Sequence, residues 1–192
     1  PPTGGTVTNA TIGGQSFRIH TFTSDGQFIS GATLSQTDVL IVGGGGSAGA
    51  RHSGGAGAGG VIHITGATIT SGTYAADLGD GGAQSPNETH GQAGQNTTFL
   101  GETANGGGLT NAYTGSCLTQ NGGSGGGESG RHCNLVGSAT QGNPSQYSGT
   151  GYGNNGGNTN TSNKHFGAGG GGAGAAGQNS TSNSMQTSNG GA

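Results

Sequence analysis

The hydrophobic residues of the chain gather in short runs that are separated by glycine. Residues 39–42 (VLIV) and 61–64 (VIHI) are apolar, and GGGGSAGARHSGGAGAGG lies between them at residues 43–60. Short apolar runs bounded by glycine are typical of strands, so we expect buried strands at residues 37–42 and 61–65. The chain therefore alternates between ordinary β-type sequence and backbone that is almost bare of side chains.

Other β signals lie on either side of these runs. Residues 15–30 (QSFRIHTFTSDGQFIS) alternate between apolar and polar, and Asp25-Gly26 in the middle predicts a β-hairpin with a two-residue turn. Residues 67–78 (ATITSGTYAADL) predict two short strands about a turn at Ser71-Gly72. Residues 1–10 predict an extended polar lead-in, and residues 1–80 together predict a β-rich part.

Beyond residue 80 the pattern changes to glycine clusters that alternate with polar segments rich in Asn, Gln, Ser and Thr. Short polar side chains bond locally to the backbone, which favours surface loops. No stretch shows helical periodicity. We therefore expect one all-β, irregular domain over residues 1–192 with essentially no α-helix, in which residues 81–192 form a glycine scaffold with polar loops.

Composition limits what can hold such a domain together. Glycine supplies 50 of 192 residues, whereas 26% of the residues are hydrophobic, 5% aromatic and 6% charged. The core that so few hydrophobic residues can form cannot offset the chain entropy by apolar burial alone. Composition by itself therefore predicts disorder. An ordered chain would need hydrogen bonds between extended glycine segments. Such a polyglycine-II bundle has three residues per turn and unpaired backbone groups that bond neighbouring strands.

Charge and hydropathy narrow the functional classes. The net charge is −3 and Lys and Arg total 4, so no basic patch favours binding to nucleic acid. No apolar run approaches the roughly 18 residues of a membrane span. The chain begins at Pro1 rather than Met, which we interpret as removal of a leader or an excerpt of a longer protein.

Two glycine motifs resemble enzyme signatures but lack the neighbouring secondary structure that those signatures need. Residues 40–50 (LIVGGGGSAGA) resemble a dinucleotide-binding fingerprint, but the following RHSGGAGAGG cannot form the helix that holds the pyrophosphate, and the next acidic residue is Asp77. Residues 122–126 (GGSGG) satisfy G-x-S-x-G without a strand–turn–helix setting. We therefore expect no enzyme activity and no cofactor.

The two cysteines, Cys117 and Cys133, predict one disulfide that closes a polar, glycine-rich loop. A loop of this length gives about 3 kcal/mol of stabilisation, and a disulfide favours an oxidising, extracellular setting. The alternative is a metal site of Cys117, His132 and Cys133. That site would be incomplete and has adjacent ligands that rarely converge, so we expect no metal.

The polar loops are candidates for contact with a partner. We consider loops 83–96, 110–121 and 142–164, in which the candidate contact residues are His90, Tyr113, Tyr147, Tyr152 and Asn154. Tyrosine among Asn, Ser and Gly gives contact area at low entropy cost, although these tyrosines could equally cap the edge of a bundle. Asn-x-Ser/Thr triplets begin at Asn9, Asn87, Asn96, Asn160 and Asn179. Chance explains them in such a composition, and glycans on them would be detected by mass.

The order of the blocks carries a family resemblance. The segment FRIHTFTSDGQF…DVLIVGGGG of residues 17–46, its continuation GGAGAGGVIHITGATITSGTYAADLGDGG, and GAGGGGAGAAGQN at residues 167–179 resemble the glycine-rich domain of bacteriophage tail-fibre and marine microbial surface proteins. The resemblance covers most of the chain. It implies a polyglycine-II bundle whose loops at one end bind host receptors.

These observations favour a non-enzymatic structural protein, extracellular or on a virion, that forms a fibre or filament with copies of itself. Exposed strand edges and glycine backbone are natural docking sites for a neighbouring copy. The candidate assembly residues lie in the N-terminal segment: Pro1, Pro2, Val7 and Ile12. The alternatives are a phage tail-fibre receptor-binding tip that uses the polar loops, and an ice-binding protein, which the long Asn- and Gln-rich loops disfavour.

Overall fold

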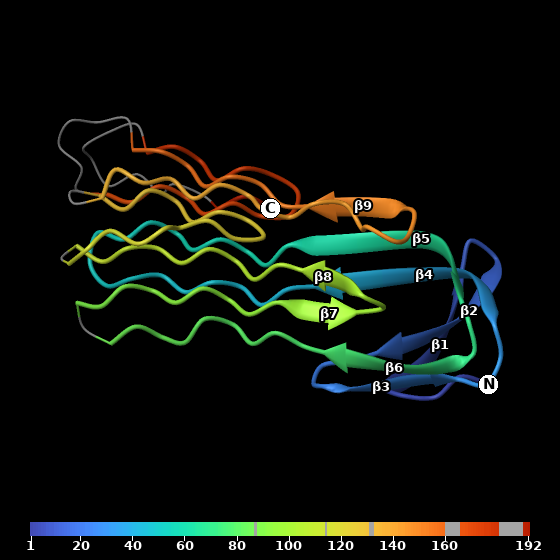
Figure 1. The fold of residues 1–192 in the computed structure, drawn as a ribbon. Helices are drawn as coiled ribbons and strands as arrows, with labels where there is room; N and C mark the ends of the chain where they lie inside the picture. The colour runs from blue at the N-terminus through green and yellow to red at the C-terminus, as the bar shows by residue number, and fades with distance from the viewer. Residues whose placement is uncertain (87, 114, 131–132, 160–165, 181–189) are drawn as a thin grey trace.

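The fold is all-β, with no helix in the part of the chain that the structure describes. The computed structural model describes residues 1–86, 88–113, 115–130, 133–159, 166–180 and 190–192. Its strands are β1 (Thr6–Ile12), β2 (Gln15–Thr21), β3 (Gly26–Ser30), β4 (Leu34–Val42), β5 (Val61–Ile69), β6 (Gly72–Asp77), β7 (Thr97–Phe99), β8 (Glu102–Ala104) and β9 (Gly149–Tyr152). Figure 1 shows the strands at one end of the molecule and glycine-rich segments that extend from them. The expected fold class is confirmed.

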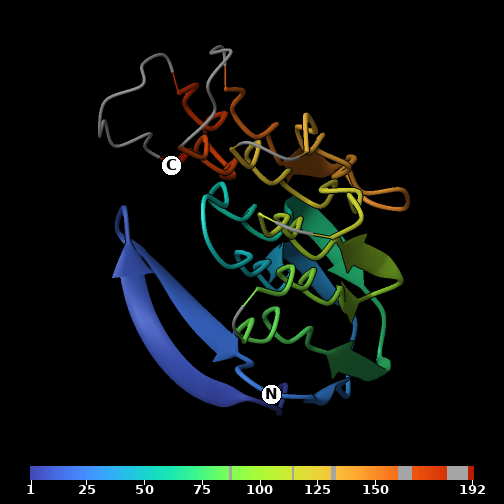
Figure 2. The same ribbon diagram turned by 90° about the vertical axis from the view of Figure 1, so that its left-hand side faces the viewer.

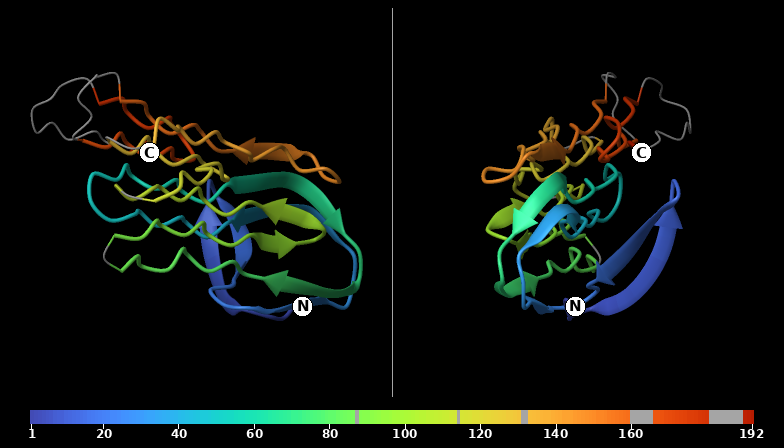
Figure 3. Two further views of the ribbon diagram at one scale, coloured as in Figure 1. Left: turned by 60° about the vertical axis from the view of Figure 1, so that its left-hand side comes forward. Right: turned by 90° about the vertical axis from the view of Figure 1, so that its right-hand side faces the viewer.

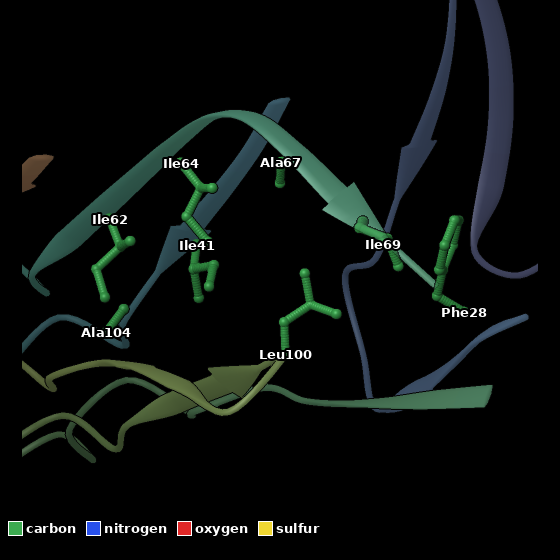
Figure 4. Close-up of a cluster of buried hydrophobic side chains, with 8 residues drawn as sticks. All are labelled: Phe28, Ile41, Ile62, Ile64, Ala67, Ile69, Leu100 and Ala104. Atoms are coloured by element: carbon green, nitrogen blue, oxygen red, sulfur yellow. The ribbon is translucent and has the colours of Figure 1, made fainter. Parts of the chain in front are cut away.

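The strands form three antiparallel sheets. Among the described residues, β1 pairs only with β2. The order of the four-stranded sheet is β3-β6-β7-β8, and the order of the three-stranded sheet is β4-β5-β9. A small core joins the last two sheets (Figure 4). Its buried members are Phe28, Ile41, Ile62, Ile64, Ala67, Ile69, Leu100 and Ala104. None of the described residues lies in a helix that is long and apolar enough to cross a membrane.

The two apolar runs form paired strands of one sheet. β4 and β5 contain the expected strands at residues 37–42 and 61–65, and Ile41 lies opposite Ile62 in the register. β5 continues to Ile69, so the strand expected after residue 67 is the end of β5. β6 begins after the Ser71-Gly72 turn but belongs to the other sheet, so the chain crosses between sheets at this turn.

The hairpin expected at residues 15–30 is wrong. β2 pairs instead with β1 through a turn at Gly13-Gly14, whose φ angles of 59° and 83° suit a tight hairpin turn. β3 pairs with β6, and the Asp25 carboxylate accepts a hydrogen bond from the Leu78 N–H (2.7 Å). Asp25-Gly26 therefore leads into another sheet. Part of the expected lead-in is the strand β1.

Extended glycine-rich segments connect the strands and pack side by side as a bundle, here called the glycine bundle. It consists of residues 43–60, 79–96, 105–130, 134–142, 153–159 and 166–180 with the gaps given above. Hydrogen bonds repeat along it every three residues. The N–H groups of residues 44, 47 and 50 donate to the carbonyls of residues 95, 92 and 89, and the carbonyls of 44, 47 and 50 accept from the N–H groups of 107, 110 and 113. A three-residue repeat is that of a polyproline-II-type strand, so these segments are polyglycine-II-like.

The centre of the bundle is residues 122–130, all of which are buried. Their N–H groups bond several other segments: Gly127 donates to Gly55, Gly125 to Asn154 and Gly123 to Gly106. Neighbouring backbones approach so closely that a Cβ on Gly125 would overlap the Gly137 carbonyl. Backbone hydrogen bonds between bare segments thus hold the part of the molecule that has no apolar core.

Candidate interaction surfaces

The β1–β2 hairpin stands away from the rest of the molecule, and we call residues 6–21 the arm (Figures 2 and 3). The arm has no third strand, because the other described strands pair in the two remaining sheets. A two-stranded hairpin is marginally stable on its own in water. The arm is therefore a surface that lacks the packing which a stable sheet needs.

One face of the arm is apolar. Side chains that lie opposite each other in an antiparallel pair share a face, which places Ile12 with Gln15, Ala10 with Phe17, and Thr8 with Ile19 on the same side. The exposed fractions are 61% for Ile12, 38% for Phe17 and 39% for Ile19. The other face carries Val7, Arg18, His20, Asn9, Thr11 and Ser16. Three large apolar side chains of one face are thus in contact with solvent.

The base of the arm is fixed to the body of the domain. Thr3 and Ile29 exchange two backbone hydrogen bonds of 2.9 and 3.0 Å at the edge of β3. The Nδ1 of His20 donates to the Gly4 carbonyl (2.8 Å), and the His20 ring packs edge-on against Phe28 with the ring centroids 5.1 Å apart. Gly4 has φ of 110° and lies against the Gln27 backbone, where a Cβ would overlap. These contacts orient the arm.

The outward face of the β4-β5-β9 sheet is also apolar, and we call it the outer sheet face. Leu40 is 66% exposed, Val42 51% and Tyr152 40%, whereas Ile41 points into the core. Val61 lies opposite both Val42 and Tyr152 in the register, so these three form one row across the sheet. Cross-strand rows of this kind normally pack against another layer.

An open groove separates the arm from the outer sheet face. Its volume is 440 Å³, and its lining residues come from β2, β4 and β5: Gln15, Phe17, Gln36, Asp38, Thr65 and Gly66. Asp38 precedes Leu40 by two residues and lies on the same face of β4, so the groove opens onto the outer sheet face. The groove therefore lies between two surfaces that both expose large apolar side chains.

The model of the glycine-rich domain family matches residues 22–192. The chain belongs to this glycine-rich domain family. No curated protein and no solved structure matches the chain. The matched part of the glycine-rich domain begins at Phe22, directly after β2 ends at Thr21, so the arm lies outside it.

A second group of candidate contact residues lies at the end of the glycine bundle that is remote from the sheets. Here the glycine-rich domain pairs Arg51 with Glu88 through an ion pair of 2.7 Å. The rings of His52 and Tyr113 lie 5.5 Å apart, and the Ala112 N–H donates to Nδ1 of His90 (3.0 Å). Two of the expected contact residues, His90 and Tyr113, are therefore near each other. We call this region the bundle tip.

The other expected contact residues lie elsewhere. Tyr147 packs against the hydrophobic core, and Tyr152 belongs to the outer sheet face. The side-chain amide of Asn154 donates to the carbonyls of Gly172 and Ala173 (2.9 and 3.0 Å), which joins two segments of the bundle. The candidate contact residues of loop 142–164 therefore do not come together with those of loops 83–96 and 110–121.

The disulfide that the sequence predicted is present in the glycine-rich domain. Cys117 and Cys133 are bonded across a separation of 16 residues. His132, which the alternative metal site would need, lies outside the described residues. No group of three potential ligands that could hold a metal ion lies in the described ranges.

The two motifs that resemble enzyme signatures are parts of the bundle. Residues 43–49 are extended rather than helical, and Ser124 of the G-x-S-x-G motif is completely buried. Its hydroxyl oxygen accepts a hydrogen bond from the Asn154 N–H (3.4 Å). These glycines serve the close approach of neighbouring backbones.

The expected assembly residues lie at the base and on both faces of the arm. Pro1 and Pro2 lie at the base, where the Pro2 carbonyl accepts a hydrogen bond from Arg18 (3.5 Å), whereas Val7 and Ile12 lie on opposite faces. The sequence did not indicate Leu40 and Val42 as surface residues, because an unbroken apolar run predicts burial on both faces. In this run Ile41 is buried and Val39 is half-buried, whereas Leu40 and Val42 are exposed.

Proposed function

We propose that the chain is a non-enzymatic structural subunit of an extracellular or virion filament, and that it assembles with copies of itself. The arm is the observation that carries this proposal. It is a hairpin to which no other described strand adds, it exposes Ile12, Phe17 and Ile19 on one face, and it lies outside the part that matches the family.

Burial of the arm supplies a driving force for assembly. Complete burial of a fully exposed large aliphatic or aromatic side chain yields roughly 1.5–3 kcal/mol. Ile12, Phe17 and Ile19 each gain a share of this in proportion to their exposed fractions of 61%, 38% and 39%. Part of this gain is offset by the loss of translational and rotational freedom on association. The fixed base of the arm limits the further cost of ordering it.

The remainder of the domain suits a rigid structural role. Many backbone hydrogen bonds of about 0.5–1.5 kcal/mol net each hold the glycine bundle. The disulfide between Cys117 and Cys133 favours an oxidising compartment. Both features support a rigid extracellular subunit.

Sedimentation velocity of arm variants tests this function. The unaltered chain should sediment at micromolar concentration as species far larger than the 18.1 kDa monomer. Ile12→Ser combined with Phe17→Ser should give monomers, because it removes the apolar face of the arm. Leu118→Ser combined with Leu135→Ser is the matched control, because these leucines are exposed to a similar extent (42% and 39%) but lie in the glycine bundle. A monomeric unaltered chain at all concentrations would reject the proposal.

The bundle tip supports a second function, recognition of a receptor on a host surface. The tip brings Tyr113, His52 and His90 together with the Arg51–Glu88 pair at one end of the molecule. Tyrosine and arginine are enriched at binding hot spots. Tyr113→Ala should then abolish binding to host cells while Tyr152→Ala does not. Equal binding by the two variants would reject this role.

A further inference from the structure

We propose that the groove between the arm and the outer sheet face is the docking site for the arm of a second copy of this chain. This inference rests on the proposed self-assembly and adds the two surfaces that meet. The apolar face of the incoming arm packs on Leu40, Val42 and Tyr152. The resident arm covers the other side of the incoming arm.

The two surfaces match in kind. Both are antiparallel β surfaces with exposed apolar rows, Ile12, Phe17 and Ile19 on the arm and Val42, Val61 and Tyr152 on the sheet. Sheets that pack face to face lie about 10 Å apart with interdigitated side chains. An arm in the groove thus gives each surface the second layer that it lacks.

The resident arm does not fill this role in its own chain. The bridge between Thr3 and Ile29 and the contacts of His20 fix its base, and the groove separates it from β4 and β5. Leu40 consequently remains 66% exposed in the single chain. A second copy brings a two-stranded arm whose apolar face can pack on this sheet.

Charge complementarity favours the same partner. Arg18 is the only Lys, Arg, Asp or Glu within residues 1–24, so this part carries +1, and the net charge of −3 for the whole chain leaves −4 for residues 25–192. Asp38 is the only such residue on β4, β5 and β9, and it lines the groove. The arm that carries Arg18 is therefore attracted at long range to the acidic body of another copy, and Asp38 contributes to that negative charge.

The area that the docked arm would bury approaches that of a specific contact. Strands of seven residues span about 23 Å, and two paired strands are about 10 Å wide. Each face of the arm then measures about 230 Å². When both faces are covered, the arm and the two surfaces that cover it together lose roughly 900 Å² of exposed area. This value lies close to the roughly 1,000 Å² expected of a biological interface, before the relief of the side chains is counted.

The arm and the groove are different surfaces, so their contact is heterologous. Each copy that donates its arm still has a free groove, and each copy whose groove is filled still has an arm to donate. A contact of this kind leads to a closed ring or to an open filament. The docking site therefore accounts for continued growth by one repeated interface.

Cysteine cross-linking between two chains tests the contact. Both native cysteines form the disulfide, so an introduced cysteine is the one free thiol. A chain with Ile19→Cys is mixed with a tagged chain with Leu40→Cys and oxidised mildly, and mass spectrometry confirms that the native disulfide persists. We expect a cross-linked heterodimer. Ser16→Cys is the matched control, because Ser16 faces away from the apolar side of the arm, and we expect little cross-linking to Leu40→Cys.

A complementation assay gives a second readout. Leu40→Glu alters the outer sheet face at the groove, and Ile12→Ser with Ile19→Ser alters the arm without changing a residue that lines the groove. All three residues are exposed, so folding should persist. Each variant alone should be monomeric. An equimolar mixture should form dimers and stop there, because it contains one intact arm and one intact groove per pair.

The outcomes separate this inference from the proposed function. Filaments of the unaltered chain without the heterodimer cross-link and without complementation would overturn the docking site and leave self-assembly in place. A single chain that carries both Ile19→Cys and Leu40→Cys gives a further outcome. If cross-links form only within this chain and not between chains, the arm closes on its own sheet, and the docking site is overturned. An unaltered chain that never self-associates would reject both.

Discussion

Individual glycines decide whether neighbouring backbones of the bundle can approach each other. Gly46 bonds to Gly57, and a Cβ at Gly46 would overlap the Gly108 carbonyl. Gly45, its immediate neighbour, is exposed, and a Cβ there would meet nothing within 4 Å. The backbone packing thus requires glycine at position 46 but would accept a side chain at position 45.

We predict that Gly46→Ala lowers the free energy of unfolding by about 3 kcal/mol or more, because the overlapping atoms are backbone and cannot move aside. Gly45→Ala is the matched control and should change it by no more than about 1 kcal/mol, in the stabilising direction if at all. Urea denaturation of both variants measures the difference. Equal destabilisation by the two substitutions would contradict this account of the bundle.

Asparagine side chains replace missing backbone partners in the bundle. The Oδ1 atoms of Asn96, Asn121 and Asn155 each accept a hydrogen bond of 2.8 Å from a backbone N–H of another segment. The sequence predicted surface loops for these polar stretches, because short polar side chains bond locally in turns. Their partners lie 10 to 17 residues away, and no local pattern identifies such partners.

At the scale of elements, one buried carboxylate fastens a loop to a strand. Glu102 of β8 is 3% exposed and accepts hydrogen bonds from the N–H groups of Ser145 and Gln146. Glu88 is also acidic but forms an ion pair with Arg51 whose side chains are more than half exposed.

We predict that Glu102→Gln lowers the free energy of unfolding by about 2–3 kcal/mol, because an amide NH₂ would then face backbone donors that need an acceptor. Glu88→Gln should cost no more than about 0.5 kcal/mol, as expected of an exposed ion pair. Denaturant titration of both variants gives the comparison. The prediction fails if Glu102→Gln is as stable as the unaltered chain.

The disulfide constrains the segment between β8 and β9. Its removal by Cys117→Ser with Cys133→Ser should lower the free energy of unfolding by about 3 kcal/mol, the value for a loop of 16 residues. Self-assembly of the folded variant should persist, because neither cysteine belongs to the arm or to the outer sheet face. Denaturation and sedimentation of this double variant test both statements, and loss of assembly by a folded variant would contradict the second.

Strands with a strong apolar pattern could be located from the sequence, whereas their pairing could not. Residues 37–42 and 61–65 lie in β4 and β5, as the apolar runs predicted. The hairpin was misplaced because Gly13-Gly14 and Asp25-Gly26 are both good turn sequences. Hydrogen bonds to distant strands decide between such turns. β7, β8 and β9 have three or four residues each, which is too short for a periodic signal.

At the scale of the whole molecule, the two parts have different sources of stability. The sheets enclose a core of eight buried side chains, and the glycine bundle is held by backbone hydrogen bonds. Low hydrophobic content predicted a small core and a bundle that depends on the backbone. Which surfaces stay exposed was not visible in the sequence, because the outer sheet face and the core face alternate within the same apolar runs.

Electron microscopy of the purified protein is the most direct test of self-assembly. The unaltered chain would be imaged in negative stain at several concentrations, without reductant so that the disulfide stays intact. We predict continuous filaments with one repeated subunit spacing. Discrete particles of monomer size at every concentration would contradict self-assembly and would direct attention to receptor binding at the bundle tip.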